Sequence, residues 1–237
     1  MSDSMLRGIG YLLSITLVLY ALSSLSKGQG FFATSVGRLF GLLVAILLAY
    51  FISRIFYGLP LDWGADGKSL SHAVALMFPL YAFSFVAVLY FGAERFMDMA
   101  RPGFVDEWSL SLIPYSLAFW ILSGILTAFS YDAVPYELFG ERGRTAGIAG
   151  ATVVFALNYN QPLLTGFWRP EDIVFFGAAF AYSYSVNGKA SSLVIAYLIS
   201  ELPLWWCLLY PLGGTVFVGY MTARFLLSAC FLFRHLA

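Results

Sequence analysis

The segment YELFGERG, residues 136 to 143, concentrates charge in a chain that carries little of it. It holds Glu137, Glu141 and Arg142, whereas only 11% of the 237 residues are charged. Carboxylates that are buried together shift their pKa values and can share a proton, so Glu137 could act with Glu141 or Glu201. On a second interpretation the segment is a solvated connection between helices, whose charges offset one another. The depth of the segment in the molecule decides between the two.

A second set of charges, Glu201 and Arg224, lies inside long apolar runs. A charge at the centre of a bilayer costs about 2.5 to 3.5 kcal/mol on insertion scales, so each needs a partner or a water-filled cavity. Each residue lies ten positions from the PLGG turn at 211 to 214, and a rise of about 1.5 Å per residue puts both about 15 Å from that turn. We therefore predict that they face the bundle interior and meet, directly or through one water. The alternative is that Arg224 extends to the surface while Glu201 lines a cavity or contacts another chain.

The elements that position these residues are apolar helices. The chain is 60% hydrophobic, with a mean hydropathy of +0.81, whereas soluble domains average about 25% charged residues. Its net charge is zero, so nothing in it favours a nucleic-acid partner. Windows of about 20 residues predict an all-α transmembrane bundle of about eight spans, near residues 6–26, 36–57, 70–92, 109–130, 145–161, 172–187, 190–210 and 213–233.

We interpret residues 1–237 as one integral membrane domain, with N-terminal spans over 6–108 and a helical core plus a C-terminal hairpin over 109–237. No signal-peptide cleavage site follows the first apolar stretch, which predicts a retained span. The fifth and sixth spans are short and polar, with residues such as Asn158, Asn160 and Gln161, so we expect them inside the bundle. Seven lysines and arginines fall on the side of the termini against five on the other, which favours termini in the cytoplasm.

The segment YELFGERG resembles the Glu-Glu-x-x-x-Arg signature of the CAAX-prenyl endopeptidase and bacteriocin-processing family (CPBP, also called Abi) of intramembrane proteases. Glu137 matches the second glutamate of that signature, and Arg142 matches its arginine if one residue is inserted. Downstream, VVFALNY at 153–159 resembles the family's Phe-x-x-x-His helix, with Phe155 in place. The stretch NGKASSLVIAYLISELP resembles the approach to the family's last histidine. The resemblance covers about residues 130–205 and implies neighbouring helices that bring Glu137 near Phe155.

The chain departs from the family at the positions that carry its chemistry. The resemblance implies a glutamate base that activates water and histidines that position it, and these positions are Tyr136, Tyr159 and Ser200 here. A tyrosine with a pKa near 10 is almost fully protonated at pH 7, so it cannot take a proton from water as a carboxylate can. We therefore assign no catalytic residue and expect that protease activity has been lost. Tyr136, Glu137, Arg142, Tyr159 and Ser200 are degenerate motif positions.

Metal and cofactor sites have little support in the sequence. The two histidines, His72 and His235, lie outside the motif segments, and no His-Glu-x-x-His helix is present, so no metal site is expected. Without a histidine in mid-span, haem or chlorophyll coordination is disfavoured, and no cofactor is expected. Cys207 and Cys230 lie in apolar runs, where we expect them to pack as small hydrophobic residues.

Three classes of function stay open. The first is a non-catalytic subunit or adaptor of a membrane protein complex, with the lipid bilayer and other membrane subunits as partners. Small residues at helical spacing would permit close helix approach there, or pack only within the monomer; they are Gly37 and Gly41, and Gly143, Gly147 and Ala151. The second class is an active intramembrane glutamate-type endopeptidase. The third is a small transporter or lipid-binding protein, in which Glu201 and Arg224 line a pathway.

Overall fold

The computed structural model describes residues 3–26, 30, 34–59, 61–101, 105, 107–159 and 172–236. Within these ranges every regular element is a helix, which confirms the helical bundle. The predicted interruption of the fifth span by Asn160 and Gln161 lies outside the described residues. Two of the counted cations, Lys27 and Arg169, lie outside them as well.

Among the described residues, four helices are long and apolar enough to span a membrane. They are α1 (Asp3–Ser26), α2 (Ser35–Phe51) with its continuation η2 (Ile52–Phe56), the continuous rod of α6 (Leu112–Ile125), η3 (Leu126–Ala133) and α7 (Val134–Gly140), and α13 (Gly214–Leu236).

Two further candidate spans are bent. α3 (Gly67–Leu76) and α4 (Phe78–Phe91) meet at 54°, and α11 (Ala190–Ser200) and α12 (Leu202–Leu209) meet at 51°. Counting each bent pair as one span gives six spans in the described residues. The shorter elements are α5 (Ala93–Met99), α8 (Arg144–Asn158), η4 (Ile173–Ala179), α10 (Phe180–Asn187) and η5 (Tyr210–Leu212).

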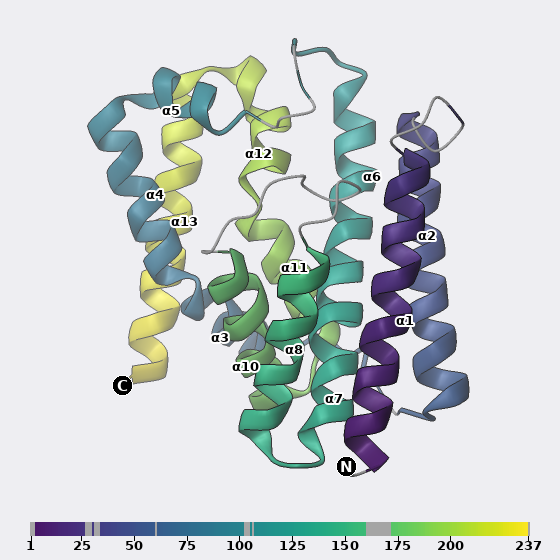
Figure 1. The fold of residues 1–237 in the computed structure, drawn as a ribbon. Helices are drawn as coiled ribbons and strands as arrows, with labels where there is room; N and C mark the ends of the chain where they lie inside the picture. Colours follow the sequence, from purple (N-terminus) through teal and green to yellow (C-terminus); the bar gives the residue numbers. More distant parts are fainter. Residues whose placement is uncertain are drawn as a thin grey trace.

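The predicted count of eight spans is not confirmed, because two of the predicted spans are short helices. α8 has 15 residues, which at about 1.5 Å per residue is about 22 Å, less than the roughly 30 Å of a bilayer core. α8 and α10 both lie beside α7 in the lower half of the bundle (Figure 1). The two described ends of the chain also lie toward this half, and their side of the membrane stays a prediction.

The rod from α6 to α7 corrects the predicted end of the fourth span near Ser130. Pro135 has no N–H group, and its ring crowds the carbonyl four residues back, which an α-helix relieves by widening into a π-helical segment. The N–H group of Val134 accordingly donates to the carbonyl of Phe129, five residues back. In this register Ser130 would need the missing N–H of Pro135, and the hydroxyl of Tyr11 donates to the Ser130 carbonyl instead, at 2.9 Å. The helix therefore continues through Gly140.

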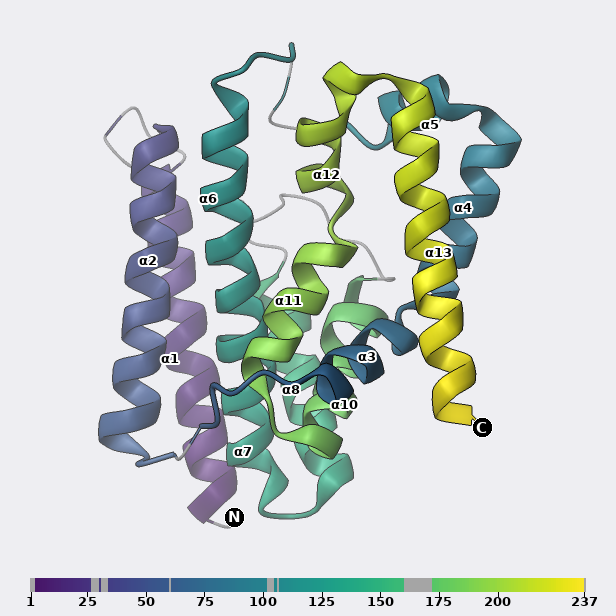
Figure 2. The same cartoon turned by 180° about the vertical axis from the view of Figure 1, so that it is seen from behind.

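The back view shows how the bent pair α11–α12 runs between α6 on one side and α13 with α4 on the other (Figure 2). The main core cluster joins large buried side chains from helices on both sides of α11, such as Tyr11, Tyr81, Phe155 and Tyr197. A second cluster, which includes Trp206 and Phe217, packs α12 against α13 and α5. The α11–α12 bend therefore lies in the interior of the bundle.

Candidate functional site

The break between α11 and α12 brings charged and polar groups into the interior. Glu201 has extended backbone angles (φ −72°, ψ 106°) and separates the two helices. Pro203 follows in the first turn of α12, where a residue without an N–H group is tolerated although it cannot continue α11. The last carbonyl groups of α11 are consequently left without intrahelical donors inside the protein.

Side chains of α13 satisfy these carbonyl groups. The hydroxyl of Tyr220 donates to the carbonyl oxygen of Ile199 at 2.8 Å. Nη1 of Arg224 donates to the carbonyl oxygen of Ser200 at 3.0 Å and to the hydroxyl of Tyr220 at 3.4 Å. Because Tyr220 and Arg224 are four residues apart, they lie on the same face of α13. This face thus serves as a cap for the broken helix.

Arg224 is buried, with 2% of its surface exposed. Its guanidinium carbon lies 4.2 Å from the centre of the Tyr81 ring, a distance at which the ring face attracts the cation. The hydroxyl of Tyr81 is hydrogen-bonded to Ser200, whose own hydroxyl donates to the carbonyl of Ala196 at 2.7 Å. Helix α4 therefore supplies a wall of the site through Tyr81, which the sequence analysis did not single out.

Glu201 is also buried, and it shares the surroundings of Arg224. Its charge acts on the phenol groups of Tyr81 and Tyr220, which the charge of Arg224 also reaches. Ion pairs between described residues are Arg7 with Asp3 and Lys189 with Asp62. Both predicted side chains thus face the interior in one neighbourhood, and their contact, direct or through a water, stays a prediction.

The degenerate motif positions fall into two groups. Tyr159 stacks on Phe155 at 4.4 Å and lies within electrostatic reach of Glu201. Ser200 belongs to the same neighbourhood, so Tyr159 and Ser200 both lie toward the α11–α12 break.

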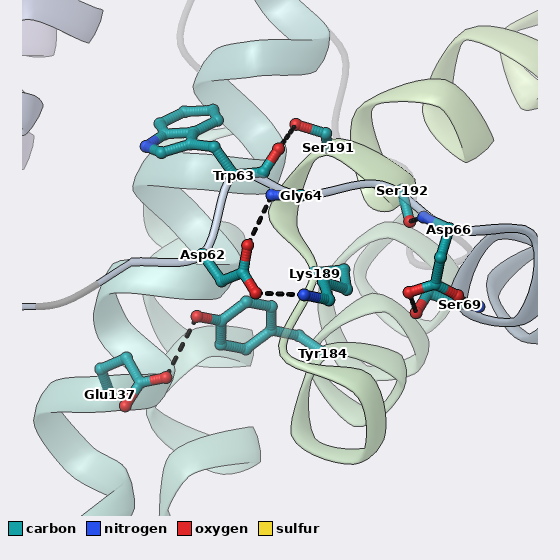
Figure 3. Close-up of polar contacts among 10 residues, drawn as sticks. All are labelled: Asp62, Trp63, Gly64, Asp66, Ser69, Glu137, Tyr184, Lys189, Ser191 and Ser192. Carbon is teal, nitrogen blue, oxygen red and sulfur yellow. Dashed lines mark hydrogen bonds and ion pairs between the residues drawn. The ribbon is translucent and has the colours of Figure 1, made fainter.

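Tyr136 and Glu137 form the other group, close to the turn between α7 and α8. The ring of Tyr136 meets the ring of Tyr184 edge to face at 5.6 Å. Oε1 of Glu137 accepts a hydrogen bond from the hydroxyl of Tyr184 at 3.1 Å (Figure 3). Among the described residues, no hydrogen bond joins Tyr136 or Glu137 to Ser200. Helices α7 and α8, which carry the first two motif segments, are neighbours, and the closeness of Glu137 to Phe155 stays a prediction.

The rest of the octapeptide is a surface turn. Glu141 and Arg142 are exposed, and Nη1 of Arg142 approaches Sδ of Met5 at 3.5 Å. Gly143, which directly precedes α8, has a φ of +116°, which favours glycine. The half-buried Glu137 therefore differs from the exposed Glu141, and the structure separates the two carboxylates that the sequence places together.

Four of the five small residues named in the sequence analysis are buried within this chain; Gly143 is exposed, and a Cβ atom there would meet nothing within 4 Å. Gly37 and Gly41 are buried on the inner face of α2. A Cβ atom on Gly147 would lie 2.7 Å from the ring of Tyr136 and 3.1 Å from Cα of Gly140, and Ala151 is fully buried. These positions serve helix approach inside the bundle.

Asp132 is a buried acidic residue beyond the predicted end of the fourth span near Ser130. It lies in η3 with none of its surface exposed, and neither carboxylate oxygen has a hydrogen-bond partner. Because Asp132 and Tyr136 are four residues apart, both lie on one face of the rod. Recognising that Pro135 widens a helix, rather than ending it, would have placed Asp132 in the interior.

The segment from Asp62 to Asp66 crosses the start of α11 (Figure 3). Asp62 pairs with Lys189, and the carbonyl of Trp63 accepts a hydrogen bond from the hydroxyl of Ser191 at 2.6 Å. The hydrogen bond from Lys189, with that from the amide of Gly64, holds the pKa of Asp62 below its usual range. The same pair raises the pKa of Lys189. We call residues 62–66 the strap.

The chain was compared with protein-family models, with curated proteins and with solved structures, and nothing matched. The resemblance to the CPBP family therefore rests on the motif segments alone.

Proposed function

We propose that this chain is a non-catalytic membrane protein with a CPBP-like core, which acts as a subunit or adaptor in a membrane protein complex. One observation carries the proposal. At the three positions where the family has its base and histidines, Tyr136, Tyr159 and Ser200 are engaged in contacts with other side chains of the chain. A site for hydrolysis needs a base within hydrogen-bond reach of a water, and these hydroxyl side chains are poor bases at neutral pH.

Glu137 is the remaining carboxylate of the motif, and its environment supports a structural role. One oxygen is occupied by the Tyr184 hydroxyl, which ties α7 to α10. The exposed Glu141 offers a matched control, because it lies four residues later at the end of the same helix.

Reconstitution with membrane-spanning peptides tests the loss of catalysis. We expect no cleavage by the wild-type chain above the level of empty vesicles. Cleavage that disappears in Glu137→Gln but persists in Glu141→Gln would contradict the proposal and assign an active endopeptidase.

The adaptor role has its own test. We expect purification from the native membrane in a mild detergent to yield at least one other membrane protein in a fixed ratio. Recovery of the chain alone, at the same ratio to lipid in several detergents, would count against a subunit role.

A small transporter or lipid-binding protein is the second candidate, and the α11–α12 break favours it. Helices broken inside a membrane bundle, with ionisable residues at the break, are typical of substrate sites in transporters. Arg224 and Glu201 meet this description, because both are buried beside the break. Uptake or exchange of a solute by vesicles that contain the purified chain would favour this class over an adaptor.

A further inference from the structure

Arg224 uses only part of its hydrogen-bonding capacity. Nη1 donates to Ser200 and Tyr220, whereas Nε and Nη2 are buried and have no partner. The guanidinium stays charged in proteins. A buried charged donor that lacks a partner is costly, so an arrangement that leaves two of them unpaired needs an explanation.

The two unpaired nitrogens form a fork. In a guanidinium group the Nε–H bond and one Nη2–H bond point the same way from one edge of the plane. This edge matches the two oxygens of a carboxylate or a phosphate, which accept both bonds in parallel. Nη1, on the other side of the group, is held by the Ser200 carbonyl, and the guanidinium carbon lies over the ring of Tyr81. Arg224 is therefore oriented before any anion arrives, with its fork unoccupied.

The start of α12 adds a second attraction for an anion. α12 begins at Leu202, next to the Ser200 carbonyl that Arg224 contacts, and no side chain caps its first turn. The N-terminus of a helix carries partial positive charge and free N–H groups that favour anions. Both features adjoin the break between α11 and α12.

We propose that the Nε and Nη2 edge of Arg224 binds an oxyanion, the carboxylate or phosphate group of a ligand that enters the bundle at the α11–α12 break. The ligand is a lipid headgroup or a free anion, which share this chemistry. Glu201 is the internal competitor, because its carboxylate lies near the same tyrosines. Glu201 also disfavours a second negative charge on the ligand. The inference does not depend on whether protease chemistry has been lost.

The experiment uses the full chain in detergent, with four probes. Inorganic phosphate and acetate represent free anions, lysophosphatidic acid represents a phosphate headgroup, and monoacylglycerol is the matched lipid without phosphate. The readouts are the midpoint temperature of unfolding as a function of probe concentration, and the mass of the intact protein with bound probe. We expect saturable stabilisation by at least one oxyanion and none by monoacylglycerol.

Variants locate the binding. Arg224→Lys keeps the charge but loses the fork, and we expect affinity to fall about tenfold or more, since a charged hydrogen bond contributes about 1.5 to 3 kcal/mol. Arg224→Met should abolish binding. Arg234→Met is the matched control on the same helix, where the arginine is exposed, and should bind as the wild type does. If Arg224→Met does not fold, Arg224→Lys alone decides.

The outcomes distinguish a free anion from a lipid headgroup, and both from the carboxylate of Glu201. Binding of phosphate or acetate assigns a free-anion site, and binding of lysophosphatidic acid alone assigns a lipid headgroup. Affinity that is unchanged in Arg224→Lys overturns the proposal. So does a wild-type chain that binds no probe. If Glu201→Gln then binds one, the carboxylate of Glu201 fills the fork in the wild type.

Discussion

Lys189 and Arg224 are two cations whose surroundings differ in one decisive respect. Lys189 lies at the surface end of α11, where 31% of its side chain is exposed, and it pairs with Asp62 of the strap. Arg224 of α13 contacts the interior end of α11, and it has 2% of its surface exposed and two nitrogens unpaired. Water can replace the partner of Lys189, so that pair contributes little. Water does not reach the buried Arg224 to take the place of a partner, so Arg224 is the cation at which we propose the oxyanion site.

The largest expected effect comes from removing the interior cation. Arg224→Met leaves the Ser200 carbonyl without the Arg224 donor and removes the cation that we predict to interact with Glu201. If the two charges interact, breaking the buried pair costs about 3 to 5 kcal/mol of unfolding free energy. The double variant Arg224→Met with Glu201→Gln should then lose less than Arg224→Met alone, because both charges are gone. Chemical unfolding of the single and double variants in detergent measures the difference. Additive losses would mean that the two charges do not interact.

The packing of α7 on α8 gives the next largest expected effect on stability. In Gly150→Ala the new Cβ atom would lie 2.3 Å from Cδ2 of Phe139 and 2.7 Å from its Cβ, so the packing of α7 on α8 must shift. Overpacking of this kind costs about 1 to 3 kcal/mol. Gly219→Ala is the control, because nothing lies within 4 Å of its added Cβ, and it should be neutral or slightly stabilising. Equal midpoint temperatures for the two variants would show that this contact yields easily.

Asp132 sharpens the comparison because it is a buried acidic side chain without a partner. Both of its oxygens lack partners, so Asp132→Leu should raise the unfolding free energy, by about 1 to 2 kcal/mol on the scale for unpaired buried polar groups. Asp98→Leu changes an exposed aspartate in α5 and should have an effect within about 0.5 kcal/mol. A marked loss of stability in Asp132→Leu alone would indicate that the carboxylate holds something in the native protein.

The strap gives the smallest effect, and it depends on pH. The pKa of Asp62 is lower in the folded chain than its unfolded value of about 3.9. Its contribution to stability is therefore complete above that unfolded value and is lost as the pH falls through the lower folded pKa. Asp62→Asn should remove this acid-dependent part and leave the midpoint temperature near pH 7 almost unchanged, because the pair is exposed. If the midpoint temperatures of the wild type and Asp62→Asn fall equally as the pH is lowered, the Asp62–Lys189 pair does not contribute to stability.

The sequence predicted the C-terminal hairpin better than it predicted the segments around Pro135 and α8. Counting residues from the PLGG turn placed Glu201 and Arg224 at one depth, and both are indeed buried beside one break. The rise of a helix is nearly constant, so such counting works within a hairpin. The hydropathy windows, in contrast, ended the fourth span too early, because the helix widens at Pro135 and continues. They also failed for α8, because hydropathy does not distinguish a full span from a short helix packed inside the bundle.

Composition and spacing alone determined that this chain forms apolar helices and that two charges lie equally far from one turn; the resemblance added that the family's base and histidine positions are Tyr136, Tyr159 and Ser200. The tertiary structure alone decided what those charges meet. Tyr81 precedes Ser200 by 119 residues, and no local pattern indicates that α4 would place its ring against Arg224. The Nε and Nη2 edge of Arg224 is unpaired because Nη1 is the nitrogen that donates to the Ser200 carbonyl. Local periodicity fixes the face of a helix, whereas the packing of distant helices fixes the rotamer and hence the partner.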